Sequence, residues 1–147
     1  FIRNYAVDLY RDAVGKELKQ EEKKLKDLEN DLEKLFKQNN NYNDKISGAR
    51  KDERDLKDEA RQNEELLKNQ ENVIQIENSD TKGKTPQEQL EKQIKSTEKD
   101  LNKAQKSQSK YSNKLNKNEK AQKDKAREIE KQKKHVEEVR TKLDNIR

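Results

Sequence analysis

Thr81-Lys82-Gly83-Lys84-Thr85-Pro86-Gln87-Glu88 contains the only proline of the chain and one of its three glycines. Pro86 fits the first position of a helix, where its missing N–H costs nothing. Thr85 is then the N-cap, and Glu88 at the third helical position completes a capping box. Gly83 supplies the positive φ of a helix-ending turn. The stretch therefore predicts a reversal between two long helices, with the turn over residues 78–85.

The composition excludes a compact globular core. Charged residues make up 46% of the 147 positions and hydrophobic residues 26%, with no Trp, Cys or Met, so we expect only a narrow apolar seam. No run of 18 apolar residues occurs, and we expect no membrane span. The absence of Cys excludes disulfides and thiolate metal sites. Because Met is absent as well, we expect the chain to be a processed product or a piece of a longer protein.

Two heptad series flank the predicted turn, one over residues 16–77 and one over residues 86–147. In the first series the a and d positions include Leu18, Leu25, Leu28, Leu32, Leu35, Tyr42, Ile46, Ala49, Leu56, Ala60 and Leu67. In the second they include Leu90, Ile94, Leu101, Ala104, Tyr111, Leu115, Ile129, Val136, Val139, Leu143 and Ile146. Neither series slips in phase, which predicts two uninterrupted coiled-coil arms.

An antiparallel pairing of the arms gives a simple numerical register. If each a residue lies opposite a d residue and the turn is tight, the two residue numbers sum to 164, which pairs Leu67 with Thr97 and Leu25 with Val139. Half of 164 is 82, and Lys82 lies in the predicted turn. The sequence thus predicts an all-α fold, a long antiparallel two-helix coiled-coil hairpin formed within one chain rather than a parallel dimer.

The charge of the two halves favours the same pairing. Residues 1–77 carry 16 Lys and Arg against 19 Asp and Glu, whereas residues 78–147 carry 20 against 12. The predicted register sets Glu22 beside Arg140 and Asp31 beside His135. Each exposed pair contributes only ~0.2–1 kcal/mol, so these pairs help to select the partner while the apolar layers hold the hairpin together.

The middle of the predicted hairpin has few apolar layers. In the register that sums to 164, Asn39 faces Lys125, Tyr42 faces Gln122, Ile46 faces Asn118, Glu53 faces Tyr111 and Leu56 faces Gln108. The run Asn39–Asn43 and Gly48 have low helix propensity. Two outcomes stay open: this zone bends or splays, or tyrosines and long polar side chains fill the layers and the helix continues.

Residues 1–15 differ from the rest of the chain in their density of apolar and aromatic side chains. Ile2, Tyr5, Leu9 and Tyr10 belong to a helical face that is too broad for one partner helix to cover. In the predicted register Ile146 meets Leu18, so residues 1–14 extend past the second arm. We expect this segment to dock on a partner protein or on a further domain of the same polypeptide.

No residue pattern indicates catalysis, a cofactor or a metal. His135 is the only histidine, and no second nitrogen or thiol ligand accompanies it, so we expect it to be solvated or ion-paired. Residues 103–134 carry twelve Lys and Arg against four Asp and Glu, a charge that binds polyanions. These residues are mostly lysines with few aromatic neighbours, which argues against nucleic acid as the main partner. A chaperone arm like the helical tentacles of the periplasmic chaperone Skp is a further alternative.

Three parts of the sequence, taken together, resemble a known group of proteins. The opening Asn4–Val14, the long Lys/Glu hairpin and the ending Val136–Arg147 together resemble the C-terminal half of small secreted envelope proteins of Bacteroidota. The resemblance implies an exported protein with a location in the cell envelope, periplasmic or associated with the outer membrane, and supplies no catalytic residues. We therefore expect a non-enzymatic arm, acting as a spacer or a protein-interaction element, with polyanion binding or chaperone-type binding as the alternatives.

The capping box generates a first prediction. Replacing Thr85 by Ala removes the side-chain acceptor for the amide of Glu88, and the loss of an N-cap costs about 1 kcal/mol. We expect a corresponding decrease of the free energy of unfolding, measured by urea denaturation followed by circular dichroism. An unchanged denaturation midpoint would place the start of the second helix elsewhere.

Overall fold

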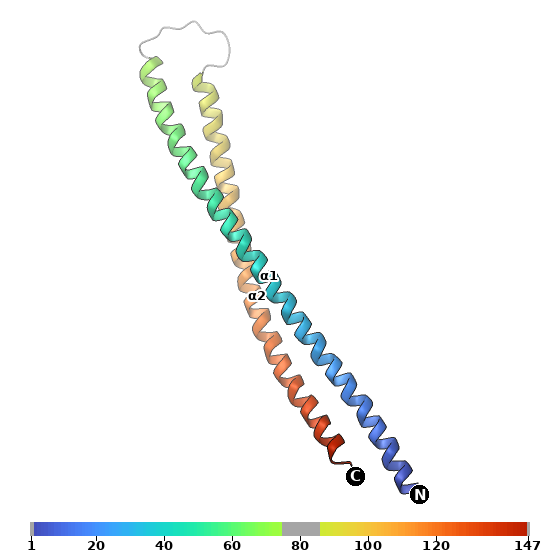
Figure 1. The fold of residues 1–147 in the computed structure, drawn as a ribbon. Helices are drawn as coiled ribbons and strands as arrows, with labels where there is room; N and C mark the ends of the chain where they lie inside the picture. Colours follow the sequence, from blue (N-terminus) through green and yellow to red (C-terminus); the bar gives the residue numbers. More distant parts are fainter. Residues whose placement is uncertain (1, 75–85, 147) are drawn as a thin grey trace. The chain divides into compact units, whose positions relative to one another are not determined.

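A computed structural model describes the backbone of residues 2–74 and 86–146 and the side chains of residues 3–69 and 86–146. These residues form two helices, α1 (Ile2–Ile74) and α2 (Pro86–Asp144), and no strand. The helices pack against each other in opposite directions (Figure 1). The all-α antiparallel hairpin predicted from the sequence is therefore confirmed.

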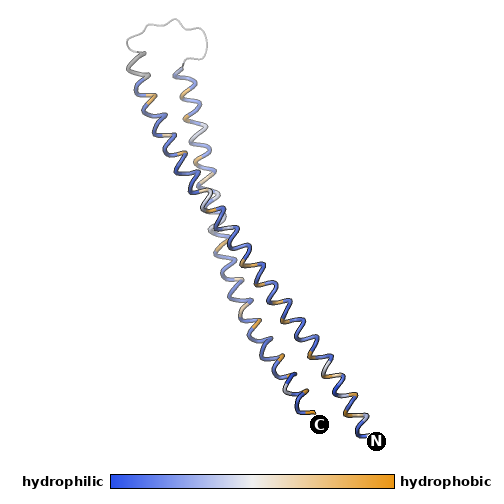
Figure 2. Tube along the Cα trace, viewed as in Figure 1, coloured by the Kyte–Doolittle hydropathy of each residue, from blue (hydrophilic) through white to orange (hydrophobic). Residues whose placement is uncertain are grey.

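The contact between the helices follows the predicted heptad positions. Every a and d side chain from Leu18 to Leu67 and from Leu90 to Ile146 is buried or half-buried, whereas most of the other side chains are exposed. Ile129, Val136 and Val139 are at most 6% exposed. Figure 2 shows the result as short hydrophobic bands that recur along two otherwise hydrophilic helices. The core is a seam of single side chains, as the composition requires.

Contacts divide the hairpin into two units, each an antiparallel helix pair. Unit 1 consists of Phe1–Asn40 and Asn116–Arg147, and unit 2 of Asn41–Leu115. Both chain ends belong to unit 1.

The register between the helices differs from the predicted one by one heptad. Contacting residues on α1 and α2 have numbers that sum to values from 152, for Tyr10 with Lys142, to 162, for Glu22 with Arg140. In unit 1, Arg11 with Ile146 gives 157, and in unit 2 Tyr42 with Tyr111 gives 153. These values centre on 157. The predicted sum of 164 is wrong, and so are the layers derived from it, such as Leu25 with Val139.

The error arises because heptad phase determines an antiparallel register only to within seven residues. Sums of 157 and 164 both place a positions opposite d positions, and the prediction chose 164 by assuming a tight turn. Polar seam residues favour 157. That register brings the buried Glu21 to Gln132 and Glu53 to Gln108. A buried carboxylate needs such hydrogen bonds.

The shift also changes the predicted overhang at the N-terminus. Val14, expected to have no partner, is the most buried large side chain, at 2% exposure. The new register places it opposite Leu143. The prediction that residues 1–14 extend past α2 is therefore wrong for the last part of that segment.

At the middle of the hairpin, the expectation that the helix continues is confirmed. α1 stays helical through Asn39–Asn43 and Gly48. The seam there is filled by a tyrosine pair and by amide side chains, since Asn118 Nδ2 donates to the Leu35 carbonyl at 3.1 Å and Gln122 Nε2 to Asn118 Oδ1 at 2.6 Å. In unit 2, Glu53 bonds with Gln108 and does not face Tyr111 as the sum of 164 predicts.

Flanking charges show the same shift. The predicted pair of Glu22 with Arg140 is confirmed, with 3.3 Å between Oε1 and a guanidinium nitrogen. Asp31 pairs instead with Lys125 at 3.7 Å, and His135 lies beside Glu21, so the predicted pair of Asp31 with His135 is wrong. The register of the seam thus determines which flanking ion pairs form.

The start of α2 has the residues expected there. Pro86 is its first residue, and Glu88 lies in its first turn. Gly83 and Thr85, and with them the predicted turn over residues 78–85, lie outside the described residues. α1 is one helix from Ile2 to Ile74, with no interruption between the predicted segments 1–15 and 16–77.

Cysteine pairs can test the register. Val14→Cys with Leu143→Cys, and Leu18→Cys with Val139→Cys, should form disulfides within one chain, independently of protein concentration. Leu25→Cys with Val139→Cys is the matched control, since one heptad displaces it by about 10 Å along the helix, beyond the reach of a disulfide. Efficient oxidation of the control pair alone, measured by non-reducing electrophoresis and mass spectrometry, would restore the sum of 164.

Candidate functional site

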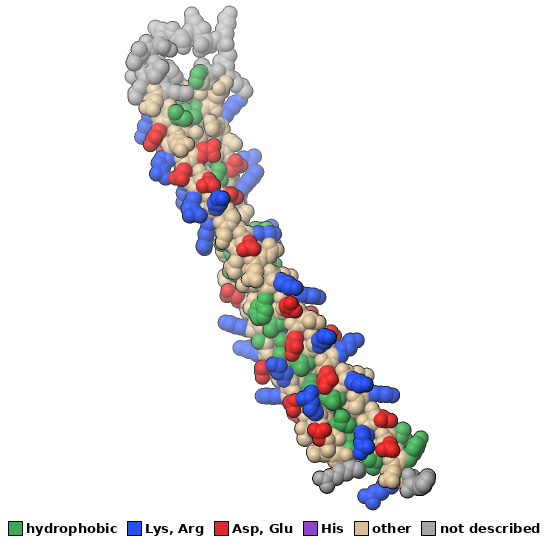
Figure 3. All heavy atoms as spheres, viewed as in Figure 1, with side chains coloured by type: hydrophobic (Ala, Val, Ile, Leu, Met, Phe, Trp, Pro, Cys, Tyr) green, Lys and Arg blue, Asp and Glu red, His purple; other side chains and the backbone are tan. Residues whose placement is uncertain are grey.

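An apolar face is exposed near the N-terminal end of α1. Tyr5 is 66% exposed, Leu9 53% and Tyr10 49%, and Figure 3 shows hydrophobic side chains at this end. The spacing of Tyr5 and Leu9 by four residues places them on one side of the helix. The side chain of Ile2, the fourth expected docking residue, lies outside the described set. The structure thus leaves three of the expected residues accessible.

The end of α2 marks the limit of this face. Arg11 donates through a guanidinium nitrogen to the backbone carbonyl of Ile146 at 3.4 Å. Lys142 Nζ lies 5.7 Å from the centroid of the Tyr10 ring, and Val14 is buried. The apolar face is therefore uncovered mainly from residue 3 to residue 10, a shorter segment than the sequence predicts.

Glu21 is a carboxylate at a seam position of unit 1. It is 8% exposed, and its Oε2 accepts a hydrogen bond from Gln132 Nε2 at 2.7 Å, while its Oε1 accepts one from Lys24 Nζ at 3.2 Å. The hydrogen bond from Gln132 is the main cause of a lowered pKa for Glu21, which Lys24 and His135 lower further. The carboxylate therefore stays ionised in the seam.

Glu53 repeats this arrangement in unit 2. Its carboxylate accepts a hydrogen bond from Gln108 Nε2 and lies 3.0 Å from Lys57 Nζ. The hydrogen bond from Gln108, followed by that from Lys57, lowers the pKa of Glu53. Each unit thus contains one acidic seam residue that is held ionised by a glutamine from the opposite helix.

His135 lies on the flank of unit 1, where the sequence places it. Its Nε2 is 3.6 Å from Glu21 Oε2, and its Nδ1 is 3.8 Å from Glu138 Oε2. In the part of the chain that the structure describes, no three acidic or histidine side chains are grouped so that they could hold a metal ion. Neither described helix has a stretch long and apolar enough to cross a membrane.

A cluster of lysines and tyrosines in unit 2 was not predicted from the sequence. The rings of Tyr42 and Tyr111 have centroids 6.1 Å apart. Around Tyr111 lie the ammonium groups of Lys45 at 4.9 Å, Lys114 at 5.4 Å and Lys110 at 5.7 Å from the ring centroid. A hydrogen bond from Lys45 is the main cause of a lowered pKa for Tyr111. We call Tyr42, Lys45, Lys110, Tyr111 and Lys114 the Tyr–Lys cluster.

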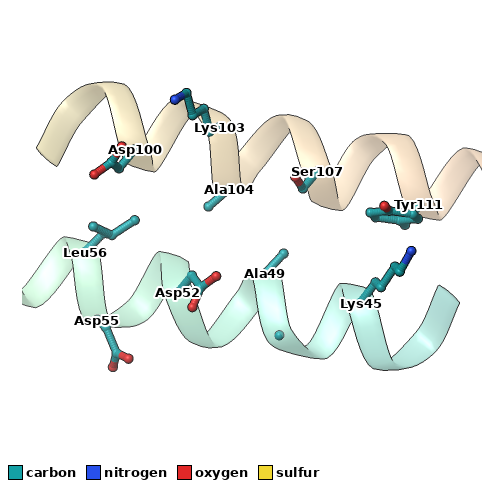
Figure 4. Close-up of a pocket in the computed structure, with 11 residues that line it drawn as sticks. Lys45, Ala49, Asp52, Asp55, Leu56, Asp100, Lys103, Ala104, Ser107 and Tyr111 are labelled. Carbon is teal, nitrogen blue, oxygen red and sulfur yellow. The ribbon is translucent and has the colours of Figure 1, made fainter. Parts of the chain in front are cut away.

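A groove of about 700 Å³ adjoins the cluster. Figure 4 shows Lys45 reaching toward Tyr111 at one end of it, with Ala49 and Ala104 between the helices farther along. The small side chains there leave the groove open, and a Cβ at Gly48, which also lines the groove, would meet no atom within 4 Å. The sequence signal for this place is the group of small residues Gly48, Ala49, Ala104 and Ser107, which becomes meaningful only once the register is known.

Comparison with known proteins gives no match. No protein-family model fits the chain, and no curated protein or solved structure matches it. The chemistry of the described surfaces is therefore the basis for a function.

The two acidic seam residues generate a prediction about pH. A folded-state pKa below the ordinary value of 4.5 means that the ionised group contributes stability above pH 4.5, and that this contribution is lost as the pH falls through the folded pKa. We expect the urea midpoint to fall below pH 4.5, and Glu21→Gln to reduce that fall. Glu29→Gln, at an exposed position on the same helix, is the control. Equal pH profiles for Glu21→Gln and the unmodified chain would contradict this role.

Proposed function

We propose that this chain is a non-enzymatic coiled-coil arm that attaches through the N-terminal end of α1 to another protein surface and acts as a spacer and interaction element. The observation that carries the proposal is the exposure of Tyr5, Leu9 and Tyr10 beside a seam that is otherwise covered. Exposed apolar groups that lie next to one another are typical of interaction sites.

Two features of the structure support attachment at this end. The face belongs to a helix whose following turns are anchored by the buried Val14 and by the hydrogen bond of Arg11 to the end of α2, so its side chains are presented on a rigid element. Burying an apolar side chain contributes ~1.5–3 kcal/mol. Tyr5 and Leu9 together can therefore provide a substantial part of a stable attachment.

The carboxylates of the seam support a structural rather than a catalytic role. A general acid or base that works near neutral pH needs a carboxylate whose pKa is raised. Hydrogen bonds lower the pKa of Glu21 and of Glu53, which suits groups that stay ionised and bonded. These residues serve to align the helices.

A location in the cell envelope completes the proposal. It rests on the resemblance of Asn4–Val14 and Val136–Arg147 to small secreted envelope proteins of Bacteroidota. Fractionation of the source cells tests it separately from the docking role, because a cytosolic location would remove the envelope assignment and leave the docking role of the apolar face unchanged.

A photo-crosslinking experiment tests the docking role in the full-length protein in its own cells. A benzophenone side chain at Tyr10 should crosslink to one defined protein surface, identified by mass spectrometry. Tyr5→Asp with Leu9→Asp should abolish the crosslink, since each substitution opposes burial worth ~1.5–3 kcal/mol, and should leave the helicity unchanged.

Phe36 provides the matched control. It lies on α1 and is 49% exposed, the same fraction as Tyr10, but it is not part of the N-terminal face. A benzophenone at this position should give no defined product, and Phe36→Asp should leave the crosslink from position 10 in place. Equal crosslinking from positions 10 and 36, or a crosslink that survives the double substitution, would contradict the proposal.

A further inference from the structure

The Tyr–Lys cluster concentrates positive charge without an acidic partner. Among the described residues, no carboxylate oxygen lies within 4.0 Å of the ammonium groups of Lys45, Lys110 or Lys114. In unit 1, by contrast, cations at the helix contact have carboxylates across the seam, as Arg140 has Glu22 and Lys142 has Glu17. The cluster therefore differs from the flanks of unit 1 in charge balance.

Two of these lysines face each other across the seam. Lys45 precedes the seam residue Ile46, and Lys114 precedes Leu115, so they occupy equivalent edge positions on the two helices. Lys45 and Lys114 both reach the ring of Tyr111, and Lys114 also reaches the ring of Tyr42 at 5.9 Å. Like charges in neighbouring positions destabilise a helix pair. The attraction of each ammonium group to an aromatic face, about 0.5–1 kcal/mol at an exposed site, offsets that repulsion only in part.

Further lysines continue from the cluster along α2. Lys99, Lys103, Lys106, Lys110 and Lys114 follow one another at intervals of three or four residues, and all five are exposed. Such intervals place them along one side of the helix, at an average spacing of about 5–6 Å along its axis. These five lysines of unit 2 therefore form a line.

The groove gives access to this line from the side of the seam. Lys45, Lys103, Ser107 and Tyr111 all contribute to its walls. Asp55 and Asp100 lie at the end of the groove away from Lys45 and Tyr111, and Asp52 lies between that end and Ala49 (Figure 4). The carboxylates therefore line the middle of the groove and its Lys103 end, and the end at Lys45 and Tyr111 is the part where an extended anion meets cations and no acidic lining residue (Figure 4).

We propose that the Tyr–Lys cluster, together with Lys99, Lys103 and Lys106, binds the phosphate groups of a linear phosphate polymer. A row of ammonium groups neutralises successive charges of such a chain. The faces of the tyrosine rings are occupied by lysine side chains and by each other, so the site recognises phosphate rather than stacked bases. The polymer can supply its phosphates as phosphodiesters or as phosphoanhydrides, and the site is separate from the apolar face of the proposed docking function.

Binding of fluorescent inorganic polyphosphate and of a single-stranded oligothymidine to the full chain tests the proposal. Both should bind at low salt and compete with each other, and the logarithm of the affinity should fall linearly with the logarithm of the salt concentration. Lys45→Gln, Lys110→Gln and Lys114→Gln together should weaken binding at least about ten-fold and reduce the salt slope by about 2. Binding of only one polymer identifies which phosphate chemistry the site accepts.

The matched control removes the same charge elsewhere. Lys19, Lys23 and Lys26 are exposed on α1 in unit 1, and their triple change to Gln should weaken binding less than about three-fold. Equal losses for the two triple variants would overturn the site and leave unspecific charge attraction. Binding to vesicles of anionic phospholipid with no binding to either linear polymer would also overturn it.

Thermal unfolding separates a binding role from a structural one. Without a polymer, the cluster variant should unfold at the same temperature as the unmodified chain or higher, because it loses the repulsion between Lys45 and Lys114. Polyphosphate should raise the midpoint of the unmodified chain and not that of the variant. A lowered midpoint combined with unchanged polymer binding would show that the lysines only support the tyrosine pair, and would overturn the proposal.

Discussion

A seam one side chain wide holds α1 to α2, and the other features of the structure depend on it. Few large apolar side chains are deeply buried, and the buried hydrophobic set is Val14, Ile46, Ala49, Leu90, Ala104, Ile129, Val136 and Val139. The buried set also includes Glu21, Asn63, Thr97 and Asn118. Glu21 and Asn118 find hydrogen-bond partners on the opposite helix, which favours the observed pairing over one that merely matches apolar positions.

This selection explains which parts of the fold could be predicted. Helix content, antiparallel pairing and the seam positions follow from heptad periodicity, and Pro86 indicates where α2 begins. The register does not follow, because periodicity repeats every seven residues and the apolar layers tolerate either choice. Hydrogen bonds such as that between Gln132 and Glu21 distinguish the alternatives, and their side-chain geometry is not visible in a pattern of hydrophobic positions.

The candidate sites differ in the same way. Tyr5 and Leu9 could be identified from the local density of apolar residues alone. Neither register places a residue of α2 opposite them, so their exposure does not depend on the choice of register. Tyr42 and Tyr111 lie on different helices and come together only in the observed register; the register with a sum of 164 places Tyr111 opposite Glu53 and leaves Lys45 without an aromatic partner. A shift of the register by one heptad would therefore remove the cation-rich site and leave Tyr111 facing a carboxylate.

The hairpin also imposes an order on assembly. Glu53 and Gln108 are separated by 55 residues in the sequence, whereas Arg11 and Ile146 are separated by 135. Closing the longer loop costs more chain entropy unless the shorter one has formed. Chain entropy therefore favours pairing that starts near Glu53 and Gln108 and reaches the chain ends later. On this argument we expect the contacts near Val14 to be among the last to form. The apolar face of Tyr5 and Leu9 lies at this end of the helix pair. A partner bound there would also stabilise the pairing of α1 with α2.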